Sequence, residues 1–174
     1  MFKKIGNFIE GISHDIRLLN LKKSIIFSLV FLVLGILSWV IGGRTDKVTL
    51  FYIFPRLALP TSIALFMWAL SFAFCGFIFS AIVFGCEKYK RRVAQKIGIL
   101  MSIMFLFTLC VYPLFFGALS PILTFFALLI SLLFCFFAIT SSIKLYSLWT
   151  ILLGIHFLWL VYNTFLALAF AFVN

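Results

Sequence analysis

Long apolar windows alternate along this sequence with short segments that hold almost all of its charged residues. The uncharged windows cover residues 24–43, 57–86, 97–143 and 145–174. A helix that crosses a membrane needs about 20 apolar residues, because it rises about 1.5 Å per residue. The third window has room for two such helices, and turn-forming residues at 117–121 divide it. The pattern therefore predicts five membrane-spanning helices, at residues 24–43, 61–86, 97–116, 121–143 and 146–172.

Residues 1–23 have a different, amphipathic pattern. Apolar side chains recur there every three or four residues: Phe2, Ile5, Phe8, Ile9, Ile12, Ile16 and Leu19. On a helical wheel they fill one arc, opposite Lys4, Asn7, His14 and Arg17. We predict a helix in the cytoplasmic membrane interface, where basic residues meet anionic lipid; a helix that binds a regulatory partner is the alternative. The chain thus divides into this segment and a transmembrane domain at 24–174.

The composition agrees with a chain that lies mostly in lipid. Of its 174 residues, 66% are hydrophobic, 10% are charged and 25 are Phe. Soluble domains are about 45–50% apolar and about 25% charged, and a fold of this size could not hide so much apolar surface from water. These values exclude a soluble enzyme, a nucleic-acid-binding domain and a disordered tail. We expect an all-α, multi-pass membrane protein with membrane lipid as its immediate partner.

The basic residues predict the orientation of these helices. Of the 14 Lys and Arg residues, only Arg44, Lys47 and Arg56 fall in segments on the side opposite the N-terminus. Because cytoplasmic loops carry the excess of Lys and Arg, we predict the N-terminus inside and the C-terminus outside a bacterial cytoplasmic membrane. The net charge of +10 is thereby explained without a nucleic-acid partner. Trp39 and Trp149, near predicted helix ends, are assigned to the interfacial aromatic belt.

The sequence contains no familiar catalytic or metal-binding motif. Its acidic residues lie at membrane edges or in loops: Glu10, Asp15, Asp46 and Glu87. A proton-coupled transporter or ion pump normally needs an ionisable group inside the membrane, so that class is disfavoured and only His156 keeps it open. Four cysteines lack metal-ligand spacing and are predicted to be packing thiols: Cys75, Cys86, Cys110 and Cys135. We predict no catalytic residues and no metal ligands.

Three predicted helices each carry an aromatic or polar stripe at helical spacing. The stripes are Trp68 with Cys75, Thr108 with Tyr112, and His156 with Trp159 and Asn163. Polar side chains in a membrane helix turn toward the protein interior, because hydrocarbon offers them no hydrogen-bond partner. The stripes therefore predict a shared apolar, aromatic pocket that fits a flat hydrophobic ligand. Interhelical hydrogen bonding without a ligand is the alternative.

Two stretches carry a family resemblance. The first runs from Pro55 to Pro60 and on to Trp68 and Gly76, with Phe72 at a position between them. The second is Pro-Leu-Phe-Phe-Gly-Ala at residues 113–118. Together with the length of the tail, these stretches resemble the tryptophan-rich sensory protein/translocator protein family (TspO, once called the peripheral benzodiazepine receptor). That family has a P-x-x-x-P-P run before its second helix, a Tyr where Phe72 stands, and W-P-P-I-F-F-G-A at the end of its third helix.

The resemblance, which extends from Gly43 onward, implies a protein that binds a tetrapyrrole such as protoporphyrin or haem beneath a covering loop. The resemblance and the aromatic and polar stripes on three predicted helices together identify candidate ligand-binding residues. These are Trp68, Phe72, Thr108, Tyr112, His156, Trp159 and Asn163. The candidate lid residues are Tyr52, Pro55 and Pro60. The family is often homodimeric, and three pairs of small residues suit either a dimer seam or packing within the chain. These pairs are Ala69/Ala73, Gly76/Ser80 and Ala167/Ala171.

Several family positions hold other residues in this chain. The family's Asn and Trp in the third helix fall at Thr108 and Val111, its Asp in the fourth at Ala127, and its Pro-Tyr in the fifth at 155–156. Its late Asn and Trp fall at Ala167 and Ala171. The light-dependent porphyrin degradation of some members is therefore in doubt here, and the expected role is sensing, sequestration or transport. A substrate-binding subunit of a vitamin transporter and a structural subunit without a ligand remain alternatives.

Overall fold

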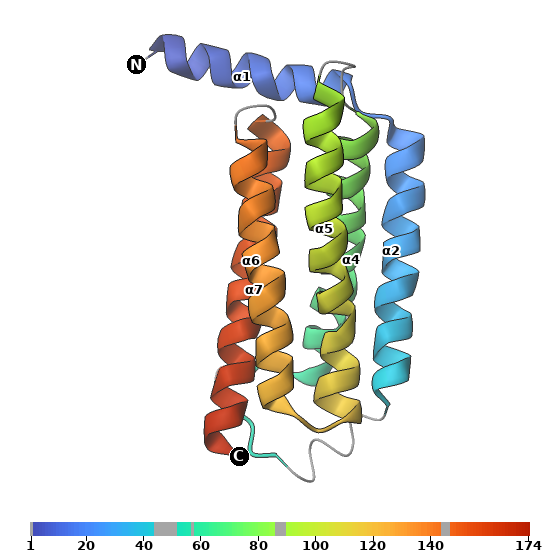
Figure 1. Ribbon diagram of the computed structural model, residues 1–174, viewed down its shortest axis with the longest axis vertical. Coiled ribbons are helices and arrows are strands. Elements are labelled where there is room, and N and C mark those ends of the chain that lie inside the picture. Colours follow the sequence, from blue (N-terminus) through green and yellow to red (C-terminus); the bar gives the residue numbers. More distant parts are fainter. Residues whose placement is uncertain (1, 44–51, 57, 86–89, 144–146) are drawn as a thin grey trace.

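The computed structural model describes residues 2–43, 52–56, 58–85, 90–143 and 147–174, and most of these form a bundle of long helices (Figure 1). The bundle helices are α2 (Leu21–Gly42), α4 (Thr61–Phe84), α5 (Arg91–Tyr112), α6 (Pro121–Ser142) and α7 (Ser147–Val173). Consecutive bundle helices run in opposite directions, and all five are long and apolar enough to cross a membrane. The prediction of an all-α, five-helix membrane protein is confirmed.

A further helix, α1 (Phe2–Arg17), lies across one end of the bundle (Figure 1). Its direction relative to the bundle is the one expected of a helix in the membrane interface. Near its C-terminal end, Asp15 is buried and accepts a hydrogen bond from the backbone nitrogen of Leu148. The basic residues that begin α2 and α5 lie at this same end, and the C-terminus lies at the other. The predicted cytoplasmic end is therefore the end that α1 covers.

Local capping explains where several helices begin. The side chain of Asn20 accepts a hydrogen bond from the backbone nitrogen of Lys23, so α2 starts three residues before the predicted span. Ser120 caps α6 in the same way, with Pro121 in the first turn. The third helix starts at Arg91 rather than at residue 97, because basic residues are good helix formers that can extend past the hydrocarbon.

The α5 helix ends in a change of helical type. Its last turn passes into a π-helical turn, η2 (Pro113–Gly117), whose closing hydrogen bond joins the backbone nitrogen of Ala118 to the carbonyl oxygen of Pro113. Leu119 follows with a positive φ of 50°, and α6 begins at Pro121. The residues that were expected to separate two spans thus form a tight reversal at the end of the bundle opposite α1 (Figure 1).

The helices α2 and α4 approach closely along small residues. A Cβ atom added to Gly76 would lie 2.6 Å from the carbonyl oxygen of Phe27, so only glycine fits there. Ser24 donates a hydrogen bond to Ser80, and Ser28 donates to the carbonyl oxygen of Ala73. The small residues that suited a dimer seam on α4 are therefore used to pack α2 within the chain.

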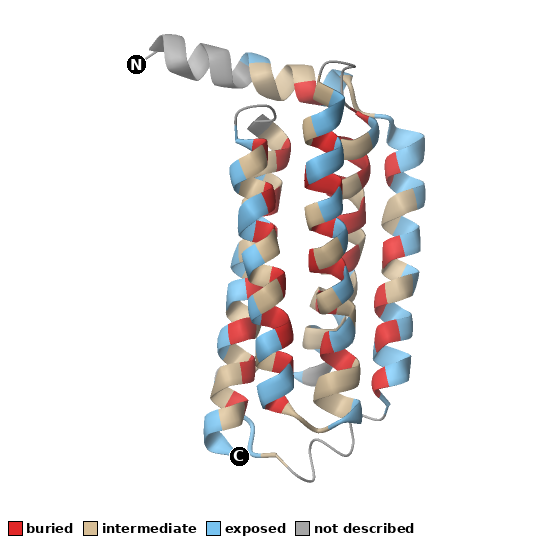
Figure 2. Ribbon diagram, viewed as in Figure 1, coloured by how far each residue is buried: buried red, intermediate tan, exposed pale blue. Residues whose placement is uncertain are grey.

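Burial follows the side of each helix that faces its neighbours (Figure 2). The outward faces carry large exposed apolar side chains, such as Val40, Leu106 and Leu158. This arrangement suits a surrounding of lipid, since an apolar outer face has no cost there. One interfacial assignment is wrong: Trp149 is only 2% exposed, and its ring lies 6.1 Å from that of Phe77. It begins α7 on the side that packs against α4, so its position near a helix end did not reveal its burial.

Candidate functional site

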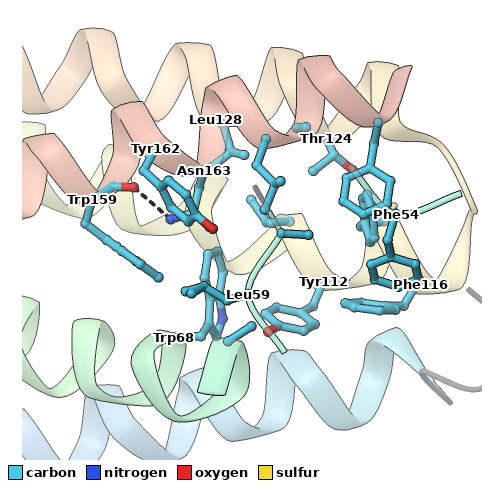
Figure 3. Close-up of a pocket in the computed structure, with 17 residues that line it drawn as sticks. Phe54, Leu59, Trp68, Tyr112, Phe116, Thr124, Leu128, Trp159, Tyr162 and Asn163 are labelled. Carbon is cyan, nitrogen blue, oxygen red and sulfur yellow. Dashed lines mark hydrogen bonds between the residues drawn. The ribbon is translucent and has the colours of Figure 1, made fainter. Parts of the chain in front are cut away.

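A pocket opens in the half of the bundle that lies away from α1 (Figure 3). Its walls come from α4, α5, η2, α6 and α7, and the segment before α4 covers part of it. The volume in it that is open to a water-sized sphere is about 110 Å³, and the pocket is partly open to solvent. The lining residues are Phe54, Ala58, Leu59, Ala64, Trp68, Val111, Tyr112, Phe115, Phe116, Thr124, Leu128, Trp159, Tyr162, Asn163, Leu166, Ala167 and Phe170.

Aromatic rings form a nearly continuous wall around this space. The ring of Trp68 meets that of Tyr112 edge-on, with centroids 4.9 Å apart. Tyr112 in turn stacks on Phe116 at 5.0 Å, and on the opposite wall Trp159 stacks on Tyr162 at 5.5 Å. None of the described lining residues carries a charge. Such a wall favours a ligand that is itself apolar and flat, because ring faces and edges offer broad contact.

Two hydrogen-bond donors in the wall have no partner among the described residues. The indole nitrogens Nε1 of Trp68 and Trp159 are buried and make no hydrogen bond to them. An unpaired buried N–H group costs about 1–3 kcal/mol, so both donors are available to a ligand that brings acceptor atoms. Asn163 instead donates through Nδ2 to the carbonyl oxygen of Trp159 at 2.7 Å, one turn earlier on α7. The residues that line the pocket (Figure 3) thus combine apolar walls with two buried indole donors that have no partner among the described residues.

The segment before α4 (residues 52–56 and 58–60) is held over the pocket by contacts of residues 52–54. The backbone nitrogen of Ile53 donates to Oδ1 of Asn174 at 2.7 Å, and Nδ2 of Asn174 donates to the carbonyl oxygen of Ile53 at 3.2 Å. Tyr52 donates through its hydroxyl to the carbonyl oxygen of Leu119. The ring of Phe54 meets that of Phe170 edge-on at 5.3 Å. These contacts hold the segment against the ends of η2 and α7.

Only part of the expected site lies in this pocket. Four of the seven expected ligand-binding residues line it: Trp68, Tyr112, Trp159 and Asn163. The other three line a smaller cavity nearer α1: Phe72, Thr108 and His156. Each of these three residues lies nearer to the α1 end of its helix than the residues that line the pocket. Thr108, for example, is hydrogen-bonded to Ser131 of α6 at 2.8 Å.

The expected lid residues have different positions relative to the pocket. Tyr52 and Pro55 belong to the fastened segment, but it is Phe54 of that segment that lines the pocket, together with Ala58 and Leu59. Pro60 precedes the first turn of α4 and accepts, through its carbonyl oxygen, a hydrogen bond from the backbone nitrogen of Ala64. Side chains next to the expected lid residues thus line the pocket, and the part of the expected covering loop at residues 44–51 and 57 lies outside the described residues.

Several lining residues were not expected from the sequence. They are mostly aromatic and come from η2 and the second half of α7: Phe115, Phe116, Tyr162 and Phe170. Along α7 a signal was present, because residues 159, 162, 163, 166 and 170 share one face at helical spacing. In η2 no periodicity reveals the direction of Phe115 and Phe116, since the π-helical turn changes it.

Within the described part of the chain, no three His, Cys, Asp or Glu side chains lie together as the ligands of a metal ion would. The pocket also lacks a nucleophile paired with a base among its described lining residues. No protein-family model, curated protein or solved structure matches this chain.

Proposed function

We propose that this membrane protein binds a hydrophobic planar ligand of the tetrapyrrole class, such as protoporphyrin or haem, in the pocket of Figure 3. The observation that carries the proposal is the pair of unpartnered indole donors, Trp68 and Trp159, in an otherwise aromatic and uncharged pocket. A porphyrin would supply acceptors for these donors and a ring for the aromatic walls, because it is a large flat π-system whose carboxylates accept hydrogen bonds.

The walls of the pocket support the same ligand class. Sites for small organic molecules have mostly apolar walls with a few convergent polar groups. This pocket has walls of that kind, and its opening to solvent leaves room for polar substituents to reach water. The resemblance of residues 55–76 and 113–118 to the TspO family points to the same ligand class, and on that resemblance we propose a homodimer in a bacterial cytoplasmic membrane.

The absence of a nucleophile–base pair among the lining residues favours sensing, sequestration or transport over turnover. We therefore propose no porphyrin-degrading activity, since the family's tryptophans in the third and fifth helices fall here at Val111 and Ala171. In this account Trp68 and Trp159 hold the ligand through their N–H groups and ring faces. The fastened segment over the pocket slows the ligand's escape.

A titration with protoporphyrin, followed by tryptophan fluorescence in lipid nanodiscs, tests the proposal. We expect quenching that saturates with a Kd below about 100 μM, or about −5.5 kcal/mol. Trp68→Phe and Trp159→Phe keep a ring but lose the donor, and each is expected to weaken binding about tenfold, as a hydrogen bond to a charged group is worth about 1.5–3 kcal/mol. Trp39→Phe is the matched control, because Trp39 lies on α2 away from the pocket. Absence of saturable binding would refute the proposal and favour a structural subunit without a ligand.

A further inference from the structure

A second, smaller cavity lies between α4, α5 and α7, on the α1 side of the pocket. It is too narrow to hold a water molecule and is lined by Ser71, Phe72, Cys75, Met104, Phe105, Thr108 and His156. Phe72, which lines this cavity, packs against Trp68, which lines the pocket, with ring centroids 5.3 Å apart. The two spaces therefore adjoin, but each has its own side chains and its own chemistry.

His156 has an unsatisfied environment in this cavity. It is only 4% exposed, and neither Nδ1 nor Nε2 has a hydrogen-bond partner within the described part of the chain. Buried polar groups in proteins almost always have a partner, because leaving one unpaired costs about 1–3 kcal/mol. Inside the hydrocarbon layer the lipid cannot supply that partner. An imidazole left in this state is available to a species that accepts its lone pair.

Two sulfur atoms line the same cavity. Cys75 is 2% exposed, and Met104 is fully buried. Cys75 carries a free thiol, whereas Cys135, the other buried thiol among the described residues, donates to the carbonyl oxygen of Leu153 at 3.9 Å. A thiol, a thioether and an imidazole therefore come together from α4, α5 and α7. This combination of soft ligands selects monovalent copper among the biological metal ions.

The balance of charge also favours a monovalent ion. Binding of a metal releases the thiol proton to solvent, so that Cys75 becomes a thiolate while Met104 and His156 stay neutral. A Cu(I) ion with one thiolate has no net charge, whereas Zn(II) or Cu(II) would leave a positive charge within the membrane. A charge at the bilayer centre costs at least about 2.5–3.5 kcal/mol. No described acidic side chain lines the cavity to neutralise it.

We infer that Cys75, Met104 and His156 form a site for Cu(I). The site does not depend on the ligand proposed for the pocket, because it shares no lining residue with it. It is three-coordinate, with the metal held by the sulfur atoms of Cys75 and Met104 and by one ring nitrogen of His156. Thr108 stays outside the coordination shell, since its hydroxyl donates to the carbonyl oxygen of Met104 at 2.8 Å.

The test uses the full chain in detergent, titrated anaerobically with Cu(I) in competition with a bicinchoninate chelator. We expect one Cu(I) per chain that resists the chelator, and an X-ray absorption spectrum with both sulfur and nitrogen scatterers. Cys75→Ser, Met104→Leu and His156→Leu are each expected to weaken binding at least tenfold, because even changes outside the coordination shell cost about 10- to 100-fold. A double variant, Cys86→Ser with Cys110→Ser, is the control and keeps the site.

Several results would overturn the inference. Copper that is lost from the double cysteine control would be bound by thiols other than Cys75. Copper retained unchanged in all three site variants would also show that it is bound elsewhere than at Cys75, Met104 and His156. Where a variant does not fold, the spectrum of the wild-type protein decides, since a shell without nitrogen excludes His156. Tighter binding of Zn(II) than of Cu(I) would contradict the charge argument.

Discussion

Asp15 accepts, through Oδ2, a hydrogen bond of 3.0 Å from the backbone nitrogen of Leu148, and this contact joins α1 to the first turn of α7. The first N–H groups of a helix have no partner within it, and a carboxylate there also meets the positive end of the helix dipole. The only described acidic residue that is buried is thus used to hold the surface helix on the bundle.

Removal of this carboxylate should release α1. We expect Asp15→Ala to destabilise the protein by about 0.5–2 kcal/mol, the usual range for loss of an N-terminal cap, and to expose the chain near Arg17. Limited trypsin digestion in nanodiscs measures this exposure as faster cleavage after Arg17. Glu10→Gln is the control, because Glu10 is exposed on the same helix. Equal cleavage rates for Asp15→Ala and wild type would show that α1 is held by other contacts.

The close approach of α2 and α4 should make Gly76 intolerant of any side chain. A Cβ atom there would also lie 2.8 Å from Cβ of Phe31. We expect Gly76→Ala to cost about 1–3 kcal/mol, as overpacking in a core does, and to lower the midpoint of thermal unfolding in detergent. Gly154→Ala is the matched control on α7, where a Cβ meets nothing within 4 Å. That change should be neutral or stabilising by up to about 1 kcal/mol; similar effects at both positions would contradict the packing.

The reciprocal hydrogen bonds between Asn174 and Ile53 should control how long a ligand stays in the pocket. We expect Asn174→Ala to raise the dissociation rate of protoporphyrin about tenfold, since each hydrogen bond contributes about 0.5–1.5 kcal/mol. Stopped-flow displacement by an excess of a non-fluorescent porphyrin measures the rate. Val173→Ala, at an exposed neighbouring position, is the control. An unchanged rate in Asn174→Ala would mean that the segment before α4 does not limit release.

Much of the fold followed from the sequence because hydrocarbon imposes simple rules on it. A charge-free window of sufficient length must be a helix, so the number of bundle helices was predictable. The start of α5 at Arg91 was not, because the helix continues into the interface, where charge is no obstacle. The role of Asp15 was also hidden, since its partner Leu148 is far away in the chain and only the tertiary fold brings the two together.

The sequence predicted which faces of the helices turn inward, but not where along each helix the pocket lies. A helical wheel correctly turned Trp159, Asn163 and His156 toward the interior. It does not show where the space between helices widens, and three residues along a helix correspond to about 4.5 Å. His156 therefore reaches a separate cavity, while Trp159 reaches the pocket. Phe170 could not be selected from the sequence, because most of the 25 phenylalanines suit a lipid-facing position equally well.

The most direct measurement is the structure of the protein with protoporphyrin bound in nanodiscs. We expect ligand density between α4 and α7, with an acceptor atom about 2.7–3.2 Å from Nε1 of Trp68 or Trp159. Phe54 and Leu59 should cover the ring system. Density on the outer, lipid-facing surface, with the pocket unchanged and both indole nitrogens still unpaired, would show that the ligand does not bind in the pocket.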